Sequence, residues 1–90
     1  MEKLQDLSNL GRTSVMWLHA AGIHSVAELR RRGAVEAWLA VKGRGFRVSR
    51  VLLYALEGAL QGCDWRELSL ERKAELLSQL ATAQMKLVRS

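Results

Sequence analysis

The stretch LSNLGRTSVMWLHAAGIHSVAEL, residues 7–29, decides the fold of this chain because it joins a tight turn, an amphipathic helix and the start of a second helix. The turn covers residues 8–11, and its Asn9 is one of the few residues other than glycine that tolerate left-handed backbone angles. The helix predicted over residues 12–21 ends at Gly22, because glycine readily takes the left-handed conformation that stops a helix. The stretch therefore predicts short helices separated by tight turns.

Capping residues mark the helices that follow. Ser25 and Glu28 have the spacing of a capping box, which predicts a helix over residues 26–32 that ends at Gly33. The same reasoning predicts short helices or single helical turns over the ranges 2–7, 34–42, 50–61, 64–68 and 70–89. Proline is absent, and the runs of β-branched and aromatic residues typical of strands are missing. We predict an all-α fold, a single small domain over residues 1–90 with five or six short helices.

Two of these helices are expected to form much of the core. Residues 50–61 are apolar around most of the helix circumference, so other helices should surround them. Gly58 inside this helix costs about 1 kcal/mol relative to alanine, which indicates that another backbone approaches closely there. The last helix is predicted to bury a stripe formed by Leu70, Ala74, Leu77, Leu80, Ala81 and Met85.

Length and composition limit the class of protein. A chain of 90 residues builds one core. The single cysteine, Cys63, forms no internal disulfide, so packing must stabilise the fold and a reducing compartment is expected. No segment approaches the ~20 apolar residues of a membrane span, and the N-terminus leads into no signal-peptide core. We expect a soluble cytoplasmic protein with no membrane partner.

Positive charge is concentrated in the middle of the chain. The formal net charge is +5, while residues 30–50 hold seven Lys and Arg against Glu36 alone, a local net charge of +6. The remainder of the chain is therefore close to neutral, at −1. Such a local excess attracts polyanions such as nucleic acid. The alternative is that these side chains only keep a small domain in solution.

Several blocks of the sequence together resemble a known family. The first is the pattern L-x-N-L-G, an amphipathic helix, then A-G-I-x-S-V-x-E-L, which resembles a helix-hairpin-helix unit near the N-terminus. With it go Trp17-Leu18, the block GAVEA at 33–37, the block LYALEGAL at 53–60, and Trp65. From about Leu7 to Leu77 the chain is similar to the C-terminal domain of the TfoX/Sxy family. The resemblance implies a helical domain related to bacterial regulators of DNA-uptake competence, here without the N-terminal domain that usually precedes it.

The helix-hairpin-helix resemblance implies a phosphate contact at the turn before the first long helix. The first amides of a helix have no partner inside it and carry the positive end of its dipole. The residues expected to contact a DNA phosphate are Asn9, Leu10, Gly11, Arg12 and Thr13, with the hydroxyl of Ser14. Asn9 departs from the glycine that nucleic-acid-binding versions prefer. The alternative is that the unit serves only for packing or protein contacts.

The basic residues supply a second set of candidate contacts: Arg30, Arg31, Arg32, Lys42, Arg44 and Arg47. Arg30 to Arg32 are consecutive on a helix, so they fan over about 200 degrees and cannot share one surface. Their place at a helix C-terminus is also favoured by the dipole alone. The segment 42–47 combines two glycines with basic residues and is expected to be an exposed loop anchored by Phe46. If this loop folds back beside Arg30 to Arg32, the two sets form one patch.

The sequence offers no basis for an enzyme, a cofactor or a metal site. His19, His24 and Cys63 match no recognised metal spacing. The segment 43–45, Gly-Arg-Gly, lacks the lysine-serine pair of a nucleotide-binding loop. Trp17, Trp38 and Trp65 could stack on bases, yet each lies in an apolar stretch where core packing is favoured.

Two functions fit these observations. The first is a non-enzymatic regulatory module, of the TfoX C-terminal type, that binds DNA weakly through phosphate contacts. The second is a protein-interaction module that binds a protein partner, a second copy of itself or a separately encoded N-terminal domain, with the positive charge steering an acidic partner.

Overall fold

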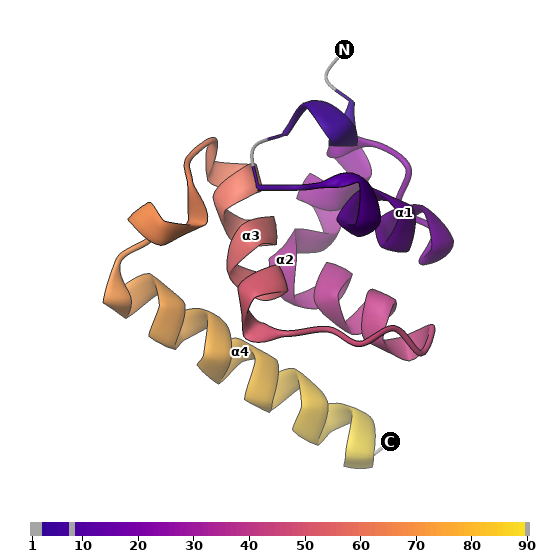
Figure 1. The fold of residues 1–90 in the computed structure, drawn as a ribbon. Coiled ribbons are helices and arrows are strands. Elements are labelled where there is room, and N and C mark those ends of the chain that lie inside the picture. Colours follow the sequence, from indigo (N-terminus) through magenta and orange to yellow (C-terminus); the bar gives the residue numbers. More distant parts are fainter. Residues whose placement is uncertain (1–2, 8, 90) are drawn as a thin grey trace.

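The helix α3 (Arg50–Gln61) lies at the centre of the domain, as its apolar sequence predicted (Figure 1). The computed structural model describes residues 3–7 and 9–89, with side chains described up to residue 86. Ser49 caps α3 by accepting a hydrogen bond from the amide of Leu52, 3.3 Å away. Most of the helix surface is buried, including Leu53 and Leu56, which are fully inaccessible. α2 (Val26–Gly43), η2 (Trp65–Glu67) and α4 (Leu70–Arg89) pack against this helix, and α1 (Arg12–Ala20) packs against α2.

The elements follow one another as η1 (Leu4–Asp6), α1 (Arg12–Ala20), α2 (Val26–Gly43), α3, η2 (Trp65–Glu67) and α4 (Leu70–Arg89). The described residues contain no strand, which confirms the all-α prediction. The predicted count of five or six helices was wrong, since residues 3–7 and 9–89 form four α-helices and two 3₁₀ turns. Segments 26–32 and 34–42 join into α2 across a kink at Gly33, where φ is 82° and ψ is 167°. None of the helices in the described ranges is long and apolar enough to span a membrane.

The stop of α1 has the geometry that the Gly22-Ile23 pair predicted. Gly22 has φ of 87°, and its amide bonds to the carbonyl of His19 at 3.0 Å. The amide of Ile23 bonds to the carbonyl of Leu18 at 2.8 Å, and both of these apolar side chains are fully buried. These two bonds form a Schellman motif, in which the residue after the glycine returns to the core.

The start of α2 is a modified capping box. The hydroxyl of Ser25 accepts a hydrogen bond from the amide of Glu28 at 3.1 Å, as predicted. The Glu28 carboxylate reaches one residue farther than in the standard motif and accepts from the amide of His24 at 2.8 Å. Two backbone donors that precede or begin the helix are thereby satisfied.

Gly58 is required by a close backbone approach, which confirms the prediction made for it. A Cβ atom built at this position would lie 2.9 Å from the carbonyl oxygen of Cys63 and 3.0 Å from the Cα of Trp65. It would also lie 2.7 Å from Nδ2 of Asn9. The turn after α3 therefore folds back onto α3, and only a residue without a side chain fits between them.

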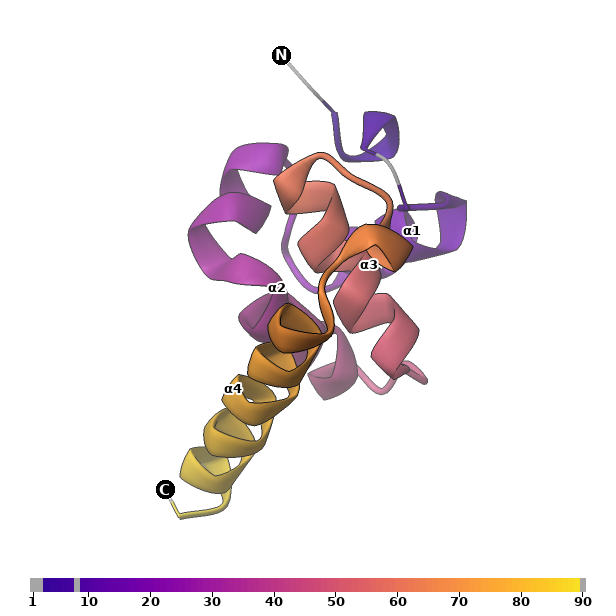
Figure 2. The ribbon, with the colours of Figure 1, turned by 90° about the vertical axis from the view of Figure 1, so that its left-hand side faces the viewer.

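The predicted buried stripe of α4 was wrong in phase. Leu70 is 82% exposed and Met85 is 57% exposed, and Ala74 and Ala81 are also exposed. Leu80 is buried as predicted, but the other buried residue of the helix is Leu76, which was not in the predicted stripe, and Leu77 is only half-buried. This rotation brings Nε of Arg72 to 2.8 Å from Oε2 of Glu57 on α3, a contact that periodicity does not reveal. Figures 1 and 2 show the C-terminal half of α4 extending away from the rest of the domain.

Candidate nucleic-acid interface

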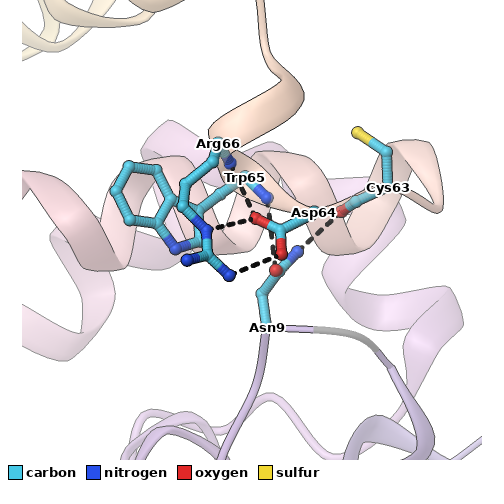
Figure 3. Close-up of polar contacts among 5 residues, drawn as sticks. All are labelled: Asn9, Cys63, Asp64, Trp65 and Arg66. Atoms are coloured by element: carbon cyan, nitrogen blue, oxygen red, sulfur yellow. Dashed lines mark hydrogen bonds and ion pairs between the residues drawn. The ribbon is translucent and has the colours of Figure 1, made fainter.

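Asn9, the first candidate phosphate contact, is held by the protein itself (Figure 3). Its backbone has φ of 75°, so the predicted left-handed conformation is confirmed. Its Nδ2 donates to the carbonyl of Cys63 at 2.7 Å, and its Oδ1 accepts from the amide of Trp65 at 3.2 Å. The Asn9 side chain therefore joins the N-terminal turn to the segment between α3 and α4. Ser8, the predicted start of this turn, lies outside the described residues.

The N-terminus of α1 presents free backbone donors next to exposed side chains. Gly11 is the N-cap residue and supplies no side-chain hydrogen bond to the helix. Gly11, Arg12 and Thr13 are exposed, whereas Leu10 is 7% exposed and packs in the core. The first amides of α1 thus have no side-chain partner among the described residues and carry the positive end of the dipole. Of the five turn residues predicted, Gly11, Arg12 and Thr13 are placed to meet a ligand.

The basic residues of the chain fall into a paired and an unpaired group. Arg66 and Arg72 form ion pairs with Asp64, Glu57 and Glu75 at 2.8 to 3.0 Å. By contrast, ten exposed cationic side chains have no carboxylate within ion-pair distance in the described part of the chain. These are Lys3, Arg12, Arg30, Arg31, Arg32, Lys42, Arg44, Arg47, Arg50 and Lys86.

The paired group shows what a structural arginine looks like in this fold. Arg66 donates from Nε to Oδ1 of Asp64 at 3.1 Å and from Nη2 to Oδ2 at 3.0 Å (Figure 3). The hydrogen bonds from the Arg66 side chain and amide lower the pKa of Asp64 from 3.8 to about 2. Arg72 also forms ion pairs within the fold, with Glu57 and Glu75, and its hydrogen bond to the carboxylate of Glu57 raises the pKa of the Arg72 guanidinium. Among the described residues, no comparable arrangement fixes the unpaired group.

The loop that carries Arg44 and Arg47 is anchored on α1. Phe46 stacks on Trp17 with ring centroids 5.4 Å apart and an angle of 18° between the planes, which confirms its anchoring role. Trp17 lies one helical turn after Thr13 on the same face of α1. Lys42 lies in the last turn of α2, just before this loop and not in it as predicted, with its ammonium 5.4 Å from the centroid of the Trp38 ring. We call the exposed residues of this region the α1–loop surface: Gly11, Arg12, Thr13, Lys42, Arg44 and Arg47.

Arg30, Arg31 and Arg32 lie apart from this loop. They precede the Gly33 kink, and the helical segment 34–43 that follows it, about 15 Å long, separates them from Arg44. Figures 1 and 2 both draw the loop away from the first half of α2. The three also diverge from one another, since Arg30 borders a hollow with Leu7 and Gln61 and Arg32 borders another beside Glu57. The structure therefore does not bring the two basic sets together into one patch.

The three tryptophans differ in how deeply they are buried. Trp38 is 7% exposed, and its Nε1 donates to the carbonyl of Ser49 at 2.9 Å, so it is a core residue as predicted. Trp17 and Trp65 lie at the rim of the core and are half-buried. Trp65 stacks on Tyr54 with centroids 6.1 Å apart, and the ammonium of Lys73 lies 5.5 Å from the Trp65 ring. Each aromatic thus has a packing partner within the chain.

The histidines form a pair that the sequence did not predict. His19 and His24 lie on either side of the α1 stop, and their ring centroids are 5.1 Å apart. Within the described ranges, no group of three or more His, Cys, Asp or Glu side chains gathers as metal ligands would.

Sequence reasoning also missed the division between paired and unpaired arginines. The spacings Asp64–Arg66 and Arg72–Glu75 were local signals of it.

Comparison with known proteins gives a consistent result. The model of the TfoX C-terminal domain matches residues 1–80. Protein Sxy of Escherichia coli (strain K12) is 35% identical over 75 residues, which are 83% of this chain and 36% of Sxy. The chain thus spans about a third of the length of that relative.

Two crystal structures of proteins from Listeria monocytogenes have the same fold. An uncharacterized protein in a triclinic crystal form is 35% identical and has a TM-score of 0.83, covering 92% of this chain and 94% of that chain. A protein of unknown function in a tetragonal form is 36% identical with a TM-score of 0.80, covering 89% and 98%.

Proposed function

The chain belongs to the TfoX C-terminal domain family, and from that premise we propose that it is a non-enzymatic regulatory module that binds nucleic acid through phosphate contacts. The contacts are made by the α1–loop surface. The resemblance to regulators of DNA-uptake competence supports regulation as the wider role. The chain matches 36% of the length of Sxy, so the role of that whole protein comes to this chain only as part of the proposal.

One observation carries the proposal: some arginines of this domain form ion pairs within the fold, and others form none among the described residues. Arg66 and Arg72 lie outside residues 30–50, and each forms an ion pair with a carboxylate of the fold. Arg44 and Arg47 are exposed and have no carboxylate within ion-pair distance in the described part of the chain. An exposed arginine that stabilises nothing in the fold is available for an external anion, and guanidinium groups match the geometry of phosphate oxygens.

The proposed contact positions the domain without reading base sequence. The amides at the start of α1 would bind one phosphate, and Arg44 and Arg47 would meet others along the backbone. A loop docked by Phe46 on Trp17 fixes the position of these cations relative to α1. Few contacts of this kind give weak affinity that depends strongly on salt.

Fluorescence anisotropy with a labelled random-sequence duplex at several salt concentrations tests the proposal. We expect micromolar binding that falls steeply with salt, and a clear loss in the double variant Arg44→Gln, Arg47→Gln. The matched control is Lys3→Gln with Lys86→Gln, which removes the same charge from exposed positions outside the α1–loop surface that form no ion pair among the described residues. No binding at low salt, or equal losses in the two double variants, would overturn it.

A protein-interaction function is the second candidate, and a separate observation favours it. Leu70 and Met85 are large apolar side chains that α4 leaves in solvent. In this function the unpaired cations would steer an acidic partner instead of holding a phosphate. The same titration separates the two candidates, because only the first requires DNA binding.

A further inference from the structure

Two histidine rings lie next to each other where α1 ends and α2 begins. The ring centroids of His19 and His24 are 5.1 Å apart, and the ring planes are inclined by 57°. Both side chains are exposed. The hydrogen bonds that these residues form within the described part of the chain are made by their backbone atoms, so the ring nitrogens have no partner there.

We propose that His19 and His24 bind one divalent metal ion of the Zn²⁺ class, through one nitrogen of each ring. Neutral imidazole is the commonest protein ligand of such ions. Two imidazoles on one tetrahedral Zn²⁺, with Zn–N distances of about 2.0–2.1 Å, place their ring centroids roughly 5 Å apart. The observed separation of 5.1 Å is therefore that of two ligands of one ion. Water would fill the remaining coordination positions.

The backbone holds the two histidines near each other without a metal. The carbonyl of His19 accepts from the amide of Gly22 at 3.0 Å, and the amide of His24 donates to the carboxylate of Glu28 at 2.8 Å. Ile23 lies between these anchors and is fully buried. Binding would then require only rotation of two exposed side chains, and such preorganisation favours affinity. The five-residue spacing matches no metal motif in the sequence because a glycine stop brings the rings together.

The number of ligands predicts the strength of the site. A structural zinc site has four protein ligands, whereas the described residues add no third His, Cys, Asp or Glu side chain to this pair. We therefore expect one ion per chain with a dissociation constant in the micromolar range. An ion that binds the folded chain also stabilises it by mass action. This proposal is independent of the α1–loop surface, and it holds whether or not the domain binds nucleic acid.

Isothermal titration calorimetry with zinc chloride, on protein without an affinity tag, tests the site. We expect binding of one ion per chain that His24→Gln weakens at least tenfold. Cys63→Ser is the control for the thiol, the other zinc ligand of comparable strength in the chain, and it should bind as the wild type does. Circular dichroism confirms that both variants fold. A wild-type chain that binds no zinc overturns the proposal, and so does binding that His24→Gln retains and Cys63→Ser loses.

A swap variant separates the geometry of the pair from the number of histidines. His19→Ala combined with Ala20→His keeps the composition and turns the ring by about 100° around α1, away from His24. Ala20 is exposed, so the fold accepts the larger side chain. Excess zinc should raise the melting temperature of the wild type by roughly 5 °C, and that of the swap variant should not respond. Equal shifts in the two proteins would mean that single exposed histidines bind the ion, and they would overturn the paired site.

Discussion

The amide of Trp65 donates a hydrogen bond to Oδ1 of Asn9 across 56 positions of sequence. The same side chain donates to the carbonyl of Cys63 at 2.7 Å, so one asparagine satisfies two backbone groups of the α3–α4 connection. Those groups are partly buried, and they would lose their partners if the side chain were absent. The turn predicted to hold a phosphate is thus also a structural joint of the domain.

Asn9→Ala should destabilise the domain by about 1–3 kcal/mol, because it removes both hydrogen bonds and places alanine at a positive φ. Asn9→Gly keeps the backbone conformation and should cost less. Urea unfolding followed by circular dichroism measures both. If the two variants lost equal stability, the left-handed backbone would contribute nothing and the hydrogen bonds alone would account for the role of Asn9.

Gly58→Ala should destabilise the domain although alanine is the better helix former by about 1 kcal/mol. The new methyl group would press on the carbonyl of Cys63 at 2.9 Å and on the Cα of Trp65 at 3.0 Å. These are backbone atoms, so the turn must move, at a cost of the order of 1–3 kcal/mol. Thermal unfolding compares it with Gly43→Ala, which meets nothing within 4 Å and should be neutral or stabilising. A stable Gly58→Ala variant would show that the turn yields easily.

The local features of this fold could be predicted from sequence, because short-range rules govern them. Gly22, Ser25 and Ser49 mark helix boundaries through bonds to residues at most five positions away. Even Gly58 gave a long-range signal, since a glycine inside an apolar helix lowers its stability unless a neighbouring backbone needs the space. The phase of α4 could not be found in this way. Apolar residues lie on both the buried and the exposed face of this helix, and the Arg72–Glu57 ion pair on the buried side joins two different helices, so periodicity gives no sign of it.

The candidate site was predictable as a set of residues but not as a surface. Composition located the cations in residues 30–50. It gave no sign that Phe46 stacks on Trp17 and so holds the loop with Arg44 and Arg47 against α1. Composition also did not show that Arg30 to Arg32, which precede the α2 kink at Gly33, lie apart from the loop that carries Arg44 and Arg47. Pairing of arginines with carboxylates likewise depends on distances that only the fold sets.

Acid should weaken the domain through Asp64, whose pKa is about 2 in the folded state and 3.8 ordinarily. A carboxyl group with a lowered folded pKa stabilises the fold above its unfolded pKa, and this contribution is lost as the pH falls from about 4 to 2. Asp64→Asn should therefore flatten the dependence of the melting temperature on pH in that window. Scanning calorimetry between pH 2 and 6 measures the effect. An unchanged slope in the variant would assign the acid sensitivity to other carboxylates, and Glu67→Gln is the control.

Thr13→Glu should change stability and nucleic-acid binding in opposite directions. Thr13 is exposed in the first turn of α1, where a carboxylate interacts favourably with the helix dipole. The variant should therefore be as stable as the wild type or more stable by about 0.3–1 kcal/mol. The same carboxylate would repel a phosphate bound at the α1 amides, so the dissociation constant for DNA should rise severalfold. Thr82→Glu, an exposed change of equal charge on α4, should leave affinity nearly unchanged. Anisotropy titrations at one low salt concentration, beside urea unfolding, make the comparison. Equal affinity losses in the two variants would mean that only net charge matters, and the α1 amides would then take no part in binding.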